Sequence, residues 1–111
     1  MESAARSKVM ESDVHVKRFS VSATQNPAKS HTQFVVSNID KTDNAPLVLE
    51  IYNTLGEMVW RKEKATSGTF ETIPWNLNTS DGASLNTGIY FFRARKGNET
   101  SSTEKIIIVR Q

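Results

Sequence analysis

The sequence contains no cysteine, and this absence excludes several chemistries at once. Without a thiol, the chain forms no disulfide and offers neither a cysteine nucleophile nor a thiolate ligand for a metal. Long hydrophobic runs are also missing, and the longest compact run covers only Ile106 to Val109. Because a membrane-spanning helix needs about 18 or more apolar residues, we expect no direct insertion into a membrane.

The sequence also lacks an excess of charge of one sign. Its 14 basic and 12 acidic residues give a net charge of +2, and both halves of the chain carry a similar balance. A nucleic-acid-binding protein concentrates basic residues on one face or in one arm. The charge distribution therefore predicts no nucleic-acid partner.

The length of 111 residues gives room for one domain. The segment from Met1 to Ser12 has no apolar stretch like that of a secretory signal peptide. We interpret residues 1–13 as a disordered tag or linker and residues 14–111 as the folded domain. If the protein is exported, we expect this sequence to be part of a longer precursor.

Short segments of alternating apolar and polar residues dominate the chain, and no window keeps the spacing of an amphipathic helix. Each segment is rich in β-branched or aromatic residues and is bounded by turn-forming residues. The seven predicted strands cover residues 14–23, 33–37, 47–52, 58–62, 69–75, 89–95 and 104–109. This pattern predicts an all-β fold, a seven-stranded immunoglobulin-like β-sandwich, with a single closed barrel as the alternative.

Turn residues between these strands predict how the chain reverses. Gly56 ends the sequence Asn-Thr-Leu-Gly, and we expect it to adopt a positive φ that brings the next strand back antiparallel. We expect the same of Gly68 and Gly97. Pro74 lies inside a predicted strand and has no N–H to donate, which indicates an edge strand.

No arrangement of catalytic residues is evident. His15 and His31 have no neighbour at the spacing of a metal site, so we interpret both as solvated side chains. Asp40, Asp43 and Asn44 lack the glycine and the terminal glutamate of an EF-hand loop, which favours a solvated turn. We expect no metal, no cofactor and no enzymatic activity in this segment.

Five aromatic residues fall at alternate strand positions or beside them, which predicts a place in the core. They are Trp60, Phe70, Trp75, Tyr90 and Phe92. The alternative is a sugar-binding platform, which would require Trp60 and Trp75 to be exposed together. Tyr90 stands near the start of its strand, where its hydroxyl is able to bind a nearby backbone group as a tyrosine corner.

Four segments follow one another between Gln25 and the C-terminus. They are the Asn-Pro motif in 25–28, the hairpin sequence LEIYNTLGEMV in 49–59, the Trp-to-Gly-Ile-Tyr stretch in 75–92, and the final strand TEKIIIVR in 103–110. In this order they resemble the C-terminal domain of cargo proteins of the bacterial type IX secretion system, and the related immunoglobulin-like domain of flagellar hook-capping proteins. The whole segment is similar to the C-terminal domain of the gingipain-like cysteine peptidase that is the sortase of that system in Bacteroidetes.

The resemblance implies a C-terminal sorting domain with protein partners, namely an outer-membrane shuttle protein and the translocon. It also implies export through the periplasm to the outer membrane and cell surface, and in many cargoes removal of the domain by the sortase. Asn53 and Asn76 stand where many relatives have aspartate, and both keep a turn-competent side chain. With no cysteine here, any such peptidase activity must lie upstream.

The last strand is the centre of the predicted signal. We expect one of its faces to join the core, and the segment from Ile106 to Val109 with its strand edge to form part of a docking surface. Gly56 and Gly88 are expected to supply backbone conformations that other residues avoid. The predicted signal and partner-binding residues are Gly56, Gly88, Tyr90, Lys105, Ile106, Ile107, Ile108, Val109 and Arg110.

Two alternatives stay open on the sequence alone. The first alternative to a sorting domain is an accessory immunoglobulin-like domain attached to a surface peptidase. The second is a carbohydrate-binding or adhesion sandwich attached to such a peptidase. Unpaired sheet edges are also compatible with a strand-exchanged dimer in isolation.

Overall fold

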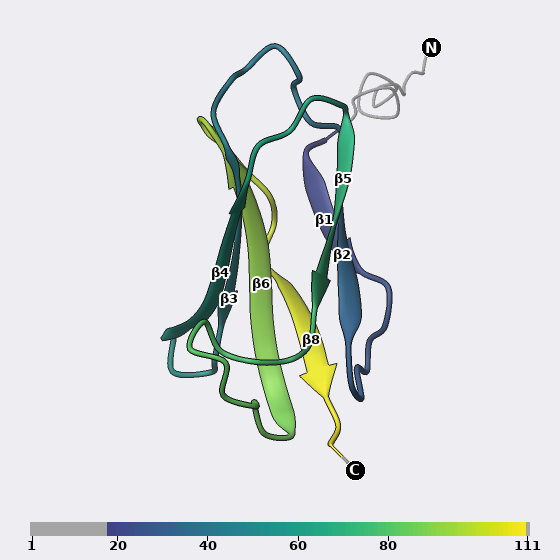
Figure 1. Ribbon diagram of the computed structural model, residues 1–111, viewed down its shortest axis with the longest axis vertical. Coiled ribbons are helices and arrows are strands. Elements are labelled where there is room, and N and C mark those ends of the chain that lie inside the picture. The colour runs from purple at the N-terminus through teal and green to yellow at the C-terminus, as the bar shows by residue number, and fades with distance from the viewer. Residues whose placement is uncertain (1–17, 111) are drawn as a thin grey trace, which may run out of the picture.

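The computed structural model describes residues 18–110 and contains eight strands in two facing sheets (Figure 1). The strands are β1 (Ser20–Ala23), β2 (Thr32–Ser37), β3 (Leu47–Tyr52), β4 (Met58–Lys64), β5 (Phe70–Trp75), β6 (Gly88–Lys96), β7 (Glu99–Thr100) and β8 (Glu104–Ile108). No helix occurs within residues 18–110. The first four residues of the predicted strand 14–23, and the predicted tag or linker, lie outside the described residues.

The smaller sheet has the order β1-β2-β5, and both pairings are antiparallel. β5 is one edge of this sheet, as the proline at position 74 predicts. The larger sheet runs β4-β3-β6, again antiparallel, and β7 and β8 pair with successive lengths of the other edge of β6. The last strand of the chain therefore lies at the side of the larger sheet.

All seven predicted strands are present, and the strand count differs because of β7. This two-residue strand is the return arm of the turn at Gly97, which has the predicted positive φ of 59°. The prediction for Gly68 is wrong: its φ is not positive, and β4 and β5 belong to different sheets rather than to one hairpin. The chain crosses between the layers at this point, which local sequence does not specify.

The core lies between the two sheets and is built around aromatic side chains. The Phe34 ring centroid lies 4.8 Å from that of Phe92 in the opposite sheet and 5.7 Å from that of Trp75 in its own sheet. None of the three is more than 2% exposed. Truncating a buried side chain of this size costs about 3–5 kcal/mol, so these rings hold the two layers together.

The core prediction is correct for most of the five aromatic residues. Trp75, Tyr90 and Phe92 are buried, and Trp60 is partly buried against the core. The prediction is wrong for Phe70, which is 63% exposed. The inward positions of β5 are those of Ile73 and Trp75, and alternation along the strand places residue 70 on the outer face.

Candidate functional site

The predicted signal strand is β8, which pairs antiparallel with the first half of β6. Ile106 and Ile108 are fully buried in the core, as expected for one face of this strand. Lys105 is exposed, and Ile107 and Val109 are half-buried on the opposite face. This pattern differs from that of a linear peptide tag, because half of the apolar side chains of the strand are buried in the core and cannot contact a partner.

The outer backbone edge of β8 is occupied by the segment that carries the Asn-Pro motif. The Asn26 side chain accepts a hydrogen bond from the Ile107 N–H at 3.0 Å and donates one to the Lys105 carbonyl at 2.8 Å. Ala28 donates its N–H to the Ile107 carbonyl at 2.8 Å and accepts one from the Val109 N–H at 2.9 Å. These groups of the predicted docking edge are therefore already bonded, which closes that part of the edge to an added strand.

Arg110 holds the C-terminal end of the strand to the long loop between β5 and β6. Its guanidinium donates to the Leu85 carbonyl at 2.8 Å and to the Leu77 carbonyl at 2.7 Å, while its N–H donates to Thr87 Oγ1 at 2.8 Å. Leu77 has a positive φ of 60°, a conformation that costs a non-glycine residue free energy. The guanidinium stabilises the loop in this conformation.

The two glycines of the predicted signal differ. Gly56 has the predicted positive φ, 81°, in a turn that Asn53 closes by accepting hydrogen bonds from the N–H groups of Leu55 and Glu57. Gly88 has no positive φ, and a Cβ there would only meet the Tyr90 ring at an ordinary 3.8 Å. The prediction of a special backbone conformation at position 88 is wrong, because this residue begins a regular strand.

Tyr90 forms the predicted tyrosine corner. Its ring is buried, and its hydroxyl donates to the Asn86 carbonyl at 2.9 Å. This bond fixes the end of the long loop at the start of β6. The residue therefore supports the strand that carries β8, and its ring is not part of the outer face.

An apolar area lies on the outer face of the larger sheet, beside the signal strand. Ile89 stands directly opposite Ile107, and Phe91 stands opposite both Lys105 and Tyr52. Side chains at such paired positions lie on one face with their Cβ atoms about 4.5–5.5 Å apart. We call these five residues the β6–β8 patch. The sequence prediction found only its β8 members.

A charged cluster borders this patch. The Glu50 carboxylate is almost completely buried, and it accepts hydrogen bonds from Arg93 Nε at 2.9 Å, from Arg95 Nη2 at 3.0 Å and from the Tyr52 hydroxyl at 3.0 Å. The Arg93 guanidinium also lies over the Tyr52 ring, 5.5 Å from its centroid. One carboxylate is therefore shared by two guanidinium groups from the neighbouring strand.

This geometry shifts the ionisation of the cluster. Burial acts to raise the pKa of Glu50, but the hydrogen bonds from Arg95, Arg93 and Tyr52 outweigh it and hold the pKa below its ordinary value. The bond to Glu50 raises the pKa of Arg93 further above its already high value. The Glu50 carboxylate and the Arg93 guanidinium are therefore both charged at neutral pH.

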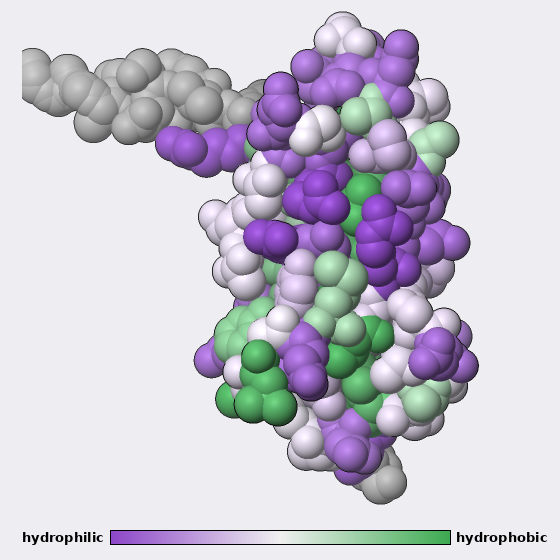
Figure 2. Space-filling view, turned by 90° about the vertical axis from the view of Figure 1, so that its left-hand side faces the viewer, coloured by the Kyte–Doolittle hydropathy of each residue, from purple (hydrophilic) through white to green (hydrophobic). Residues whose placement is uncertain are grey.

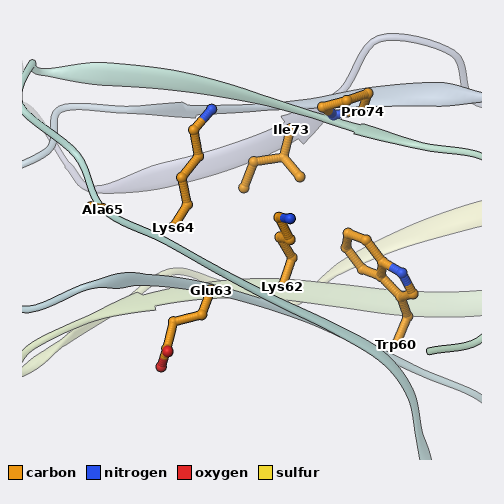
Figure 3. A pocket seen from close by; sticks show the side chains of 7 residues that line it. All are labelled: Trp60, Lys62, Glu63, Lys64, Ala65, Ile73 and Pro74. Carbon is orange, nitrogen blue, oxygen red and sulfur yellow. The ribbon is translucent and has the colours of Figure 1, made fainter.

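A groove between β4 and β5 contains Trp60, one of the two tryptophans that a sugar-binding platform would require (Figure 3). Trp60 and the lysines at 62 and 64 reach into it from β4, and Ile73 and Pro74 border it from β5. Lys64 bridges the two sheets through an ion pair with Glu71 at 3.0 Å. Trp75 is only 2% exposed beneath Trp60, so the platform of two exposed tryptophans is contradicted.

The described residues contain no group of three or more histidine, aspartate or glutamate side chains placed to hold a metal ion. Of the two histidines, His31 is exposed and bonded only to its neighbour Ser30, and His15 lies outside the described residues. Within residues 18–110 no helix is long and apolar enough to cross a membrane.

A small antiparallel sandwich whose final strand is locked by an Asn-Pro segment is the class of domain that these features define. The sequence model of the CHU_C type IX secretion signal domain matches residues 18–109. The chain therefore belongs to this family, the signal domains of type IX secretion. No curated protein sequence matches the chain.

Two solved structures from Porphyromonas gingivalis are similar to the domain. Dimeric latent PorU aligns with 82% of this chain at 25% identity and a TM-score of 0.72. PorZ, described as a surface component of the type IX secretion system, aligns with 81% at 16% identity and a TM-score of 0.53. The aligned parts are only 9% of the PorU chain and 11% of the PorZ chain. The second likeness shows the fold alone.

Proposed function

We propose that this domain is the sorting signal of a longer protein and is recognised in folded form by the type IX machinery. Its partners would be the outer-membrane shuttle protein or the translocon, and its effect would be delivery of the preceding protein from the periplasm to the cell surface. The observation that carries the proposal is the extent of the family match, because residues 18–109 coincide with the folded sandwich.

The locked position of β8 supports recognition of a folded surface. Two of its isoleucines are buried, and its outer edge is bonded to the segment around Asn26. A receptor that read the strand as an extended peptide would first have to remove both sets of contacts. Recognition of the intact domain avoids that free-energy cost.

We also propose that the domain has no catalytic role of its own. The chain has no cysteine, and His31, the histidine that lies within residues 18–110, is exposed and bonded only to the Ser30 hydroxyl, so it has no carboxylate partner for acid-base catalysis. Any catalytic activity of the parent protein would then reside in its other domains.

A carrier fusion tests the sorting role. A periplasm-targeted reporter enzyme is joined to residues 14–111 and produced in a bacterium with an active type IX system and in a mutant lacking the translocon. We expect reporter activity on the surface of the first strain and in the periplasm of the second. Periplasmic retention in both strains would contradict the proposal and would favour an accessory domain.

A further inference from the structure

The outer faces of the two sheets differ in chemistry. On the outer face of the smaller sheet, each apolar residue stands opposite polar ones: Val35 opposite Ser22 and Thr72, Phe70 opposite Ser37, and Pro74 opposite Gln33. The outer face of the larger sheet carries the β6–β8 patch, with Ile89 44% exposed and Phe91, Ile107 and Tyr52 half-buried. An antiparallel sheet face that contacts only water is expected to carry polar residues at these outward positions.

Cationic side chains outnumber carboxylates on the outer sheet face around the patch. Arg93 and Arg95 share the single carboxylate of Glu50, which leaves one net positive charge on this cluster. Lys105 is exposed, and it makes no ion pair with any residue in the described range 18–110. The patch therefore contains one cation without an ion pair in this range, Lys105, and is bordered by two guanidinium groups that share a single carboxylate.

A shallow concavity continues the patch toward the β3–β4 turn. Its lining residues are Tyr52, Asn53, Thr54, Gly56, Phe91, Arg93 and Thr103. The turn itself is rigid, because Asn53 donates to the Glu57 carboxylate at 2.8 Å and accepts bonds from two N–H groups. Leu55 at its tip is 81% exposed. Hydrophobic side chains gather in the lower half of the face shown in Figure 2.

Strand addition at β8 does not account for these features. The outward N–H and C=O groups of Ile107 are bonded to Asn26 and Ala28, so an added strand would have to displace them. A partner that uses this side of the molecule must therefore contact side chains on the outer sheet face. Such a face supports a broad apolar contact surrounded by charged groups.

We infer that the β6–β8 patch is the docking surface of the domain, and that its partner is a protein surface with an apolar centre and carboxylates at its rim. This inference rests on the proposed sorting function and names the face through which that function operates. Charge complementarity identifies the partner class, because the cations from β6 and β8 would attract a surface rich in Asp and Glu.

Charge-changing variants of the carrier fusion test the inference. Ile89→Glu and Lys105→Glu alter the patch, whereas Phe70→Glu and Lys41→Glu make the same changes at exposed positions elsewhere. We expect at least a tenfold loss of surface reporter activity for the two patch variants and near wild-type delivery for the two controls. The thermal unfolding midpoint of each isolated domain, followed by circular dichroism, checks that the fold is retained.

The outcomes separate the two proposals. Normal delivery of both patch variants, with the unmodified fusion also delivered, would overturn the docking surface and leave the sorting function intact. An equal loss in Phe70→Glu would overturn it as well, because the effect would not belong to the patch. Failure of the unmodified fusion to reach the surface would overturn the sorting function and the inference together. Lys105→Glu keeps the test valid if Ile89→Glu unfolds.

Discussion

Asn26 is a residue whose side chain takes the place of a strand. Its amide group has a donor and an acceptor, and both face the backbone of β8. An amide side chain is able to satisfy one N–H and one C=O in this way, as a neighbouring strand would. The Asn-Pro motif of the signal therefore has a structural role in the terminal strand, although 79 and 81 positions separate the bonded residues.

We predict that Asn26→Ala lowers the free energy of unfolding by about 1–2 kcal/mol, because two hydrogen bonds to β8 are lost. Urea unfolding followed by tryptophan fluorescence measures the change. Asn44→Ala removes an exposed amide with no hydrogen bond within the described residues, and we expect a change of less than about 0.5 kcal/mol. Equal stabilities of the two variants would show that the amide does not hold the strand.

Among the secondary-structure elements, two strand pairs depend on tight turns that contain glycine. The β3–β4 hairpin needs a positive φ at Gly56, and the β6–β7 turn needs one at Gly97. The surroundings of the two glycines differ, because a Cβ at Gly56 would meet open space, whereas one at Gly97 would clash with an Asp43 carboxylate oxygen. Buried Lys96 holds that same loop by donating to the carbonyls of Asp40 and Asp43.

These differences predict a ranking of alanine substitutions. Gly56→Ala should cost about 1–2 kcal/mol from backbone conformation alone. Gly97→Ala should cost more, because the Asp43 side chain must also move. Gly68→Ala is the control, since this glycine has no positive φ and its Cβ would meet only a backbone oxygen at 3.9 Å. Thermal unfolding of the three variants measures the ranking, and a Gly68→Ala cost as large as that of Gly56→Ala would refute it.

The buried carboxylate of Glu50 ties β3 to β6 and makes the pairing of these elements sensitive to acid. Because its pKa is lower in the folded state than in the unfolded chain, folding favours the deprotonated form. The stabilisation is complete above the ordinary pKa of 4.5 and is lost as pH falls through the folded-state value.

We predict that Glu50→Gln destabilises the domain by about 2 kcal/mol at neutral pH, and that the gap to wild type narrows below pH 4.5. Urea unfolding at a series of pH values provides the measurement. Glu63→Gln is the matched control, because its ion pair with Arg61 is exposed and should contribute less than about 1 kcal/mol. A constant gap between wild type and Glu50→Gln at all pH values would contradict the prediction.

For the whole molecule, the terminal strand and the sandwich depend on each other. Ile106 and Ile108 are both fully buried, and each contributes roughly 1.5–3 kcal/mol to folding. The β6–β8 pairing and the Arg110 contacts add to this. A domain of this size is stable by only about 5–15 kcal/mol, so loss of the strand removes much of the total.

We predict that deletion of residues 106–111 unfolds the domain and abolishes delivery of the carrier. A carrier that ends in residues 104–111 alone should also stay in the periplasm, because the strand lacks the sheet that presents it. Circular dichroism and surface reporter activity measure the two effects. Delivery by the eight-residue tail would instead identify the signal as a linear tag.

Much of this fold is predictable from local patterns. Period-two alternation locates every strand within the described residues except the two-residue β7, and four of the five aromatic residues predicted for the core lie in it or pack against it. Phe70 fails because alternation alone does not say which of two faces is covered. The prediction for Gly88 fails because this residue begins a regular strand, where its backbone has no positive φ and needs no conformation that other residues avoid.

The sequence by itself determined the strands, the Gly56 turn, the tyrosine corner and the division of the final strand into two faces of which one is buried. Each depends on residues close together in the chain. Only the tertiary structure decided that β4 and β5 part into different sheets, that Asn26 closes the edge of β8, and that Ile89 and Phe91 extend the outer face beside it. These features join residues distant in sequence, and the packing of the two layers selects them.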